Sequence, residues 1–194
     1  MISIDAIILA GGKASRMGGP DKVMLELEGR KLVERAVDAA LTAGCESVAV
    51  VGPRRELCVA DPVRIAYVQE DPPFSGPVAA LNAARDVGHA EWVLLLAADL
   101  PRVAGVVSLL GQAIAADPEV PAHLIKAADG HLEWLCSAMR REEFEKALDR
   151  VPHLQVGVRR LFDGLIAEVH LDPDGLTDDV DTPEMWEQAQ QRGL

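Results

Sequence analysis

The sequence lacks any long run of apolar residues and any recognisable leader segment. Its longest continuous apolar stretch, residues 92–98, ends at Asp99. This is far short of the roughly 20 residues that a membrane-spanning helix needs. Residues 1–10 have neither the basic start nor the small-residue cleavage site of a secretory signal. We therefore expect no membrane association and a cytoplasmic location.

Cysteine is scarce, and histidine forms no metal-binding pattern. Cys45, Cys58 and Cys136 are widely spaced and form no CxxC pair, so we expect reduced thiols rather than a disulfide or a zinc site. The histidines form no HxH or HExxH motif, and we interpret them all as surface or loop residues. They are His89, His123, His131, His153 and His170.

Positive charge is also in short supply. The formal net charge is −12 and no dense basic patch is present, so we expect no nucleic-acid partner. Residues 11–22 are the exception, because Lys13, Arg16 and Lys22 stand there against the single acid Asp21. The acidic counterpart near the end of the chain contains Asp178, Asp179 and Asp181. A local basic group favours a small anionic ligand. The acidic cluster suggests a cation, although its composition alone favours a solvated surface.

What the sequence does contain is an alternation of strand and helix patterns. Short apolar runs predict buried strands at residues 4–10, 47–51, 63–68 and 92–97. Amphipathic periodicity predicts helices at residues 32–41, 76–87 and 103–114. Later patterns predict strands at 122–127, 131–137 and 165–171, and helices near 144–151, near 156–162 and from Thr182-Pro183-Glu184 onward.

This order predicts an α/β fold in one domain that spans residues 1–194. Successive strand–helix–strand units with right-handed crossovers give a Rossmann-like, three-layer arrangement with a mainly parallel central sheet. The turn signal Asp129-Gly130 predicts a hairpin, and therefore an antiparallel addition late in the chain. Ligands of such sheets bind at the carboxyl ends of the strands, where the loops 11–22, 71–77 and 99–101 are expected to meet.

The first loop has the composition of a phosphate-binding loop without matching the common motifs. It is neither a Walker A loop nor a GxGxxG fingerprint. Gly11 and Gly12 let backbone N–H groups approach a phosphate, and Arg16 and Lys22 offset the charge of a triphosphate. An ordinary strand-to-helix turn with surface bases is the alternative interpretation.

Three further positions carry candidate chemistry at these strand ends. Asp99 follows a central strand and is placed to hold a hard cation, or simply to begin the next helix. Asp71 is a candidate acceptor for a base or ribose, or a turn residue, and Gly76 opens a helix whose N–H groups can face phosphate. No Ser–His–Asp or Cys–His set predicts a covalent intermediate. Nucleotidyl transfer needs none, because orientation and charge neutralisation are enough.

The motif Leu9-Ala10-Gly11-Gly12, with Ser15-Arg16-Met17-Gly18 and Asp21-Lys22, resembles the signature loop of the molybdenum cofactor guanylyltransferases. The resemblance continues through Asp71, Gly76-Pro77, residues 92–101 and Thr182-Pro183-Glu184, and covers nearly the whole chain.

The resemblance implies transfer of GMP from GTP to the phosphate of molybdopterin, with Mg²⁺ as cofactor. It implies that Leu9, Ala10 and Gly11 contact guanine through backbone, that Lys22 binds triphosphate and that Asp71 binds the nucleoside. It further implies that Asp99 holds both the nucleotide and the metal, and that Asp181 lies near the metal.

The sequence departs from that family at three places. Val51-Gly52 stands where the family has an asparagine, Asp179-Val180-Asp181 where Asn-x-Asn is frequent, and Glu133-Trp134-Leu135-Cys136 where a proline-containing stretch is expected near the acceptor.

An anionic acceptor needs a local basic patch, for which we select Arg159 and Arg160; a solvated helix face is the alternative interpretation of this pair. The same chemistry with CTP or a sugar phosphate, and a non-catalytic nucleotide-binding regulator, remain alternatives. The sequence does not indicate the oligomeric state.

Overall fold

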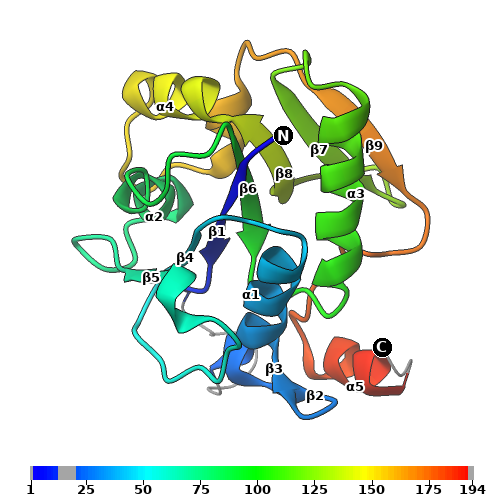
Figure 1. The fold of residues 1–194 in the computed structure, drawn as a ribbon. Helices are drawn as coiled ribbons and strands as arrows, with labels where there is room; N and C mark the ends of the chain where they lie inside the picture. The colour runs from blue at the N-terminus through cyan, green and yellow to red at the C-terminus, as the bar shows by residue number, and fades with distance from the viewer. Residues whose placement is uncertain (1, 13–20, 192–194) are drawn as a thin grey trace.

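A mixed sheet forms the centre of the computed structural model, which describes residues 2–12 and 21–191 (Figure 1). Within these residues the sheet has seven strands in the order β5-β4-β1-β6-β8-β7-β9. The strands β5, β4, β1 and β6 are parallel, β8 is antiparallel to β6 and β7, and β9 is parallel to β7. Their bounds are β1 Ile4–Leu9, β4 Val48–Val51, β5 Ile65–Val68, β6 Trp92–Ala97, β7 Ala122–Ala127, β8 Leu132–Arg140 and β9 Glu168–Asp172.

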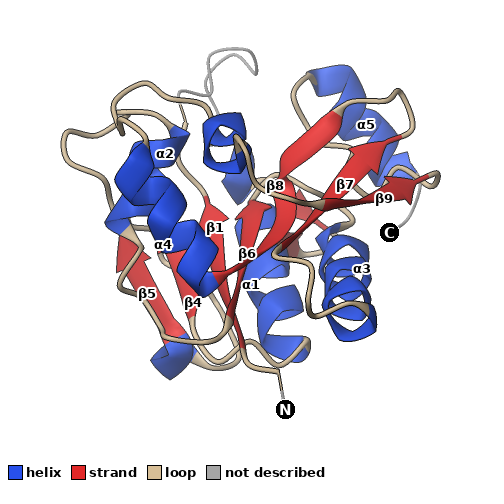
Figure 2. Cartoon of the chain, turned by 90° about the horizontal axis from the view of Figure 1, so that it is seen from above, coloured by secondary structure: helices blue, strands red, loops and turns tan. Residues whose placement is uncertain are grey.

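Helices cover both faces of this sheet, which confirms the three-layer α/β prediction (Figure 2). One face carries α1 (Leu32–Thr42) and α3 (Val103–Ala116). The other carries α2 (Pro77–Ala83), α4 (Arg141–Arg150) and the 3-10 helix η3 (Val158–Phe162). The short 3-10 helices η1 (Lys22–Met24) and η2 (Pro62–Arg64) lie in the connections. No helix in the described part of the chain is long and apolar enough to cross a membrane.

The alternation of side chains along a strand explains why each apolar run is buried on both faces. In β6, Trp92, Leu94 and Leu96 belong to the core on the α1–α3 side. Val93 and Leu95 of the same strand belong to the core on the α2–α4 side. A continuous apolar run in the sequence therefore becomes a central strand, with the bounds that the pattern predicts.

A third, smaller core fixes the last helix of the chain. The helix α5 (Pro183–Gln191) packs its Ala189 against Leu27 and Leu32, together with Val180. Leu27 belongs to the hairpin of β2 (Glu26–Leu27) and β3 (Arg30–Lys31), which the sequence did not predict. Met185 N donates to Thr182 Oγ1 at 3.3 Å, which confirms the predicted helix start.

A buried ion pair lies at the edge of the sheet that contains the amino-terminal end of β1. The Asp5 side chain is 2% exposed, and its Oδ2 accepts from Arg141 Nη2 at 2.6 Å. The same carboxylate accepts from Ser47 N at 3.0 Å and from Ala90 N at 2.8 Å. One carboxylate thus joins β1, the segments that lead into β4 and β6, and the first residue of α4.

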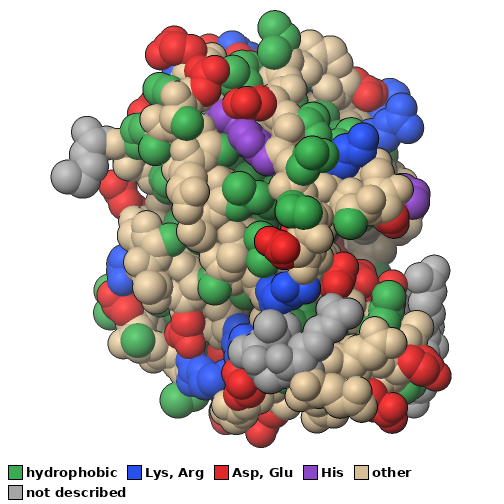
Figure 3. All heavy atoms as spheres, turned by 90° about the vertical axis from the view of Figure 1, so that its right-hand side faces the viewer, with side chains coloured by type: hydrophobic (Ala, Val, Ile, Leu, Met, Phe, Trp, Pro, Cys, Tyr) green, Lys and Arg blue, Asp and Glu red, His purple; other side chains and the backbone are tan. Residues whose placement is uncertain are grey.

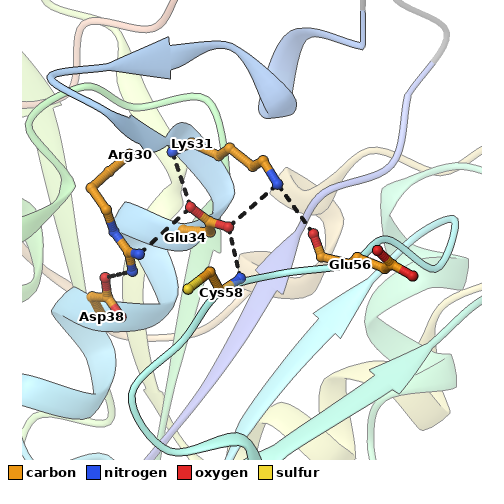
Figure 4. A network of polar contacts seen from close by, with 6 residues as sticks. All are labelled: Arg30, Lys31, Glu34, Asp38, Glu56 and Cys58. Carbon is orange, nitrogen blue, oxygen red and sulfur yellow. Dashed lines mark hydrogen bonds and ion pairs between the residues drawn. The ribbon is translucent and has the colours of Figure 1, made fainter.

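A second buried carboxylate, Glu34, ties together the loops that border the opposite edge (Figure 4). Its Oε1 accepts from Cys58 N at 2.8 Å and its Oε2 from Lys31 N at 3.2 Å. Burial alone would raise the pKa of Glu34, but these N–H donors and the charges of Lys31 and Arg30 lower it below its ordinary value. The loop after β4 is held in this way against the start of α1.

Two sequence expectations are corrected here. The helix predicted at residues 76–87 ends at Ala83, and Ala84, Arg85 and Val87 make i→i−3 turns instead. His123 is fully buried on β7 rather than lying on the surface or in a loop. The cysteines are free thiols, as predicted.

Candidate active site

A pocket of about 460 Å³ lies at the carboxyl edge of the sheet, where parallel α/β folds place their ligands. The end of β1 contributes Leu9, Gly11 and Gly12 to its wall. The end of β6 contributes Ala97 and Asp99, so two neighbouring parallel strands both line the same cavity.

Two backbone segments are in close contact next to the lining residue Gly11. Ala10 N donates to Val51 O at 2.8 Å, and Gly52 N donates to Val68 O at 2.8 Å. Gly52 has φ +140°, and a Cβ there would lie 2.8 Å from Gly11 N and 2.9 Å from Gly11 Cα. A glycine at position 52 is thus required by the close contact between the loops that follow β1 and β4.

The segment after β5 forms another wall of the pocket, and hydrogen bonds with Glu70 and Gln155 hold it in place. Glu70 is buried, and its Oε1 accepts from Phe74 N at 2.8 Å. Phe74 has φ +64°, and its carbonyl accepts from Gln155 Nε2 at 2.9 Å. Gln155 N also donates to Ser75 O at 2.6 Å. Glu70, Phe74 and Gln155 all line the pocket, together with Gly76 at the start of α2.

Charged groups converge at one end of the pocket. Lys22 Nζ lies 2.5 Å from Asp99 Oδ2 and 2.6 Å from Asp181 Oδ1. Partial burial on its own would lower the pKa of Lys22, but the two carboxylates raise it above its ordinary value. The predicted basic and acidic residues, 159 positions apart in the case of Lys22 and Asp181, thus meet at a single point.

A third carboxylate completes this cluster. One oxygen from each of Asp99, Asp179 and Asp181 lies within 4.8 Å of the others. Burial, together with the negative charges of Asp99 and Asp181, raises the pKa of Asp179. A set of carboxylate oxygens at this spacing, with an ammonium already between two of them, fits a hard divalent cation such as Mg²⁺ or Mn²⁺.

The acidic segment owes its position to Asp172 at the end of β9. Asp172 is 1% exposed, and its Oδ2 accepts from Thr177 N at 2.8 Å and from Thr177 Oγ1 at 2.9 Å. Val180 is fully buried in the core beside α5. Thr177 and Val180 are both held in this way. Asp179 and Asp181, the two neighbours of Val180, therefore place their carboxylates next to Asp99.

A second pocket, of about 310 Å³, adjoins the first one. Both pockets share Ala97, Asp99 and Leu135. The second is also lined by Glu133, Cys136, Val158, Thr177 and Asp179. Asp99 therefore stands at the boundary between two cavities.

The remaining predicted residues lie apart from these walls. Ala10 is buried, and Asp71 is exposed. Neither is among the residues that line the first pocket. Arg159 and Arg160 are exposed on η3, directly after Val158 of the second pocket, and Arg160 Nη1 lies 2.7 Å from Asp163 Oδ2. Arg16 lies outside the described residues.

Sequence reasoning missed Glu70, Phe74 and Gln155. The turn-forming segment 70–77 was the available signal for the first two, but its exposed acid Asp71 was selected instead of the buried Glu70. Gln155 carries no local signal, because it reaches Phe74 across 81 positions.

The fold is that of nucleotidyl transferases. A nucleotidyl transferase from Methanothermobacter superimposes with a TM-score of 0.75 over 99% of this chain and 98% of its own, at 17% identity. A Mycobacterium tuberculosis protein solved in complex with manganese superimposes with a TM-score of 0.70 over 98% of both chains, at 21% identity.

The sequence comparisons define the family. Residues 6–170 match the family model described as MobA-like NTP transferase domain, and the chain belongs to this family. A molybdenum cofactor guanylyltransferase from Shewanella sp. strain MR-4 is 30% identical over 82% of this chain and 79% of its own length. One from Shewanella amazonensis is 32% identical over 68% of this chain, and the match spans 66% of the relative.

Proposed function

We propose that this chain transfers GMP from GTP to the phosphate of molybdopterin and releases pyrophosphate, forming a guanine dinucleotide of the molybdenum cofactor. The observation that carries the proposal is the convergence of Lys22, Asp99 and Asp181 where two pockets share Asp99. Nucleotidyl transfer needs such an arrangement, with one cavity for the donor, one for the acceptor, and neutralising charge between them.

The first pocket suits the donor nucleoside. It is lined mainly by glycine backbone and apolar side chains, and its volume of about 460 Å³ lies within the range of small-molecule sites. The absence of a side chain at Gly11 leaves room for the exocyclic amino group of guanine. Backbone carbonyls of the pocket wall are the proposed acceptors for the guanine N–H donors, which favours GTP over CTP. Asp71, which is exposed and does not line the pocket, is kept as a proposed contact of the nucleoside.

Lys22 supports the triphosphate end of the donor. In the structure the Lys22 ammonium is paired with the carboxylates of Asp99 and Asp181. In the sequence Lys22 follows the glycine-rich loop that is proposed to bind the phosphates. We assign it to the donor phosphates, to which it moves from Asp99 and Asp181 as GTP enters. Arg16 belongs to the same loop in sequence and is proposed to share this role.

The carboxylate cluster is proposed to hold Mg²⁺ through Asp99 and Asp181. When bound, the ion supplies Lewis-acid polarisation and neutralises charge at the transferred phosphoryl group. The acceptor cavity needs such a positive charge, because Glu133 and Asp179 line it and would repel an anionic phosphate. Arg159 and Arg160 follow the lining residue Val158 and are the proposed acceptor-binding bases.

The reaction then needs no protein nucleophile. A phosphate oxygen of the acceptor attacks the α-phosphorus of GTP, one new P–O bond forms, and the bond from the α-phosphorus to the departing pyrophosphate breaks. This chain's own residues orient the two substrates and hold charge, with Lys22 facing the donor phosphates.

The proposal is tested by removing one carboxylate charge at the shared boundary. Asp99→Asn should lower pyrophosphate release from GTP and molybdopterin by roughly 100-fold or more. The matched control is Asp174→Asn, which removes the same charge from an exposed position in the segment after β9 and should leave turnover unchanged. Full turnover of Asp99→Asn in the presence of excess chelator would contradict the proposal.

A further inference from the structure

Two histidines and a glutamate meet at the outer edge of the sheet and form a group separate from the carboxylate cluster. His123 lies on β7, and Glu168 and His170 lie on the edge strand β9. The register pairs His123 with Glu168, and the two-residue period of a strand turns Glu168 and His170 to the same face. The proposed transfer reaction uses none of these three residues.

The ligand atoms of these side chains converge at the spacing that a metal ion imposes. His123 Nδ1 lies 3.1 Å from His170 Nε2 and 3.6 Å from Glu168 Oε2, and His170 Nε2 lies 3.8 Å from the same oxygen. In a tetrahedral zinc site with bonds of about 2.0–2.1 Å, two ligand atoms are separated by roughly 3.3 Å. The observed triangle therefore needs only a few tenths of an ångström of adjustment.

The surroundings fix His123 and leave one side of the cluster open to solvent. The His123 side chain is completely buried and packs on Trp92, with ring centroids 5.5 Å apart. His170 is 19% exposed and Glu168 is 48% exposed, so solvent reaches the cluster from the β9 side. Figure 3 shows histidine side chains at the surface of this face, bordered by acidic ones. A water molecule can thus supply a fourth ligand.

We propose that His123, Glu168 and His170 bind a divalent ion of the zinc class, separately from the carboxylate cluster. Two imidazole nitrogens and one carboxylate oxygen suit borderline-soft ions such as Zn²⁺, whereas the cluster around Asp99 offers carboxylate oxygens alone. The ion would cross-link β7 to β9, and β9 leads directly into Asp172 and the acidic segment that follows it. Its role is to fasten the edge strand that positions this segment.

The test is calorimetric titration of Zn²⁺ into tag-free, chelator-treated protein, in buffer that contains excess magnesium. We expect one site per chain in the wild type, loss of this site in His170→Ala, and affinity lowered about tenfold or more in Glu168→Gln. Zn²⁺ should also raise the unfolding temperature of the wild type but not that of His170→Ala. Co²⁺ in place of Zn²⁺ should give the visible absorption bands of a tetrahedral site.

Two variants serve as matched controls. His131→Ala removes an exposed histidine whose Nδ1 lies 2.8 Å from Asp129 Oδ2, and Cys58→Ser removes the exposed thiol. Both should bind Zn²⁺ as the wild type does. The proposal is overturned if the wild type binds no Zn²⁺, which leaves only a hydrogen-bonded histidine pair, or if His170→Ala binds it equally well.

Discussion

Replacing Asp5 by asparagine should destabilise the fold more than any comparable surface change. The substitution keeps the shape of the side chain but leaves the Arg141 guanidinium, 11% exposed, without its counter-charge. It also places an amide NH₂ where two oxygens now accept from Ser47 N, Ala90 N and Arg141 Nη2. At least one buried donor must then face another donor.

The expected loss follows from these contacts. Breaking a buried pair by removing one partner costs about 3–5 kcal/mol, because the remaining charge stays desolvated. For a chain of this size, each kcal/mol lowers the unfolding temperature by roughly 2–4 °C, so the total shift is on the order of 6–20 °C. Arg141→Met should be costly too, and the double variant should lose less than the sum of the two single losses.

Urea unfolding followed by circular dichroism measures these differences. The matched control is Asp149→Asn, which breaks the surface pair with Arg85, whose N–O distance is 2.9 Å and in which Asp149 is 67% exposed. That pair should contribute about 1 kcal/mol or less. If Asp5→Asn costs no more than Asp149→Asn, the buried pair does not stabilise the fold as described.

Two further predictions concern the loops that border the site. The pKa of Glu34 is lower in the folded state than its ordinary value of 4.5. The ionised Glu34 side chain therefore stabilises the fold at pH values above 4.5, and this stabilisation is lost as the pH falls through the pKa of the folded state. Glu34→Gln should therefore be less stable by about 1–3 kcal/mol at pH 7, with a difference that shrinks in acid; equal urea midpoints at pH 7 would count against this. Gly52→Ala should weaken GTP binding several-fold in calorimetry. The added Cβ would lie 2.8 Å from Gly11 N and would displace Gly11, which lines the pocket. Gly29→Ala, at φ +77° with nothing within 4 Å, should lower stability alone, and equal GTP affinities for the two variants would refute the reasoning.

Local sequence patterns were sufficient for the elements that lie in the centre of the sheet. Residues 92–97 form a strand with the predicted bounds, because a continuous apolar run ended by a charged residue suits a strand covered on both faces. The hairpin of β2 and β3 escaped prediction because two-residue strands carry no periodicity. Its place depends on the packing of Leu27 against Val180 and Ala189, more than 150 positions away.

The site shows the same division between local and long-range information. Lys22, Asp99 and Asp181 were selected from loop position and charge, and the structure brings them together. Gln155 could not be found, because its contact with Phe74 exists only after the chain has folded. His123 was interpreted as a surface residue, since its strand pattern does not reveal that β8 and β9 both pair with β7.

The central claim is guanylyl transfer to molybdopterin, and product identity tests it most directly. The purified chain is incubated with Mg²⁺, molybdopterin and equal concentrations of GTP and CTP, and the products are identified by mass spectrometry. We predict a molybdopterin guanine dinucleotide in excess over the cytosine product, because unmet donors and acceptors of a mismatched base cost about 1–3 kcal/mol each. A predominant cytosine product would contradict the choice of donor. No dinucleotide with molybdopterin, together with turnover of another phosphorylated compound, would contradict the choice of acceptor.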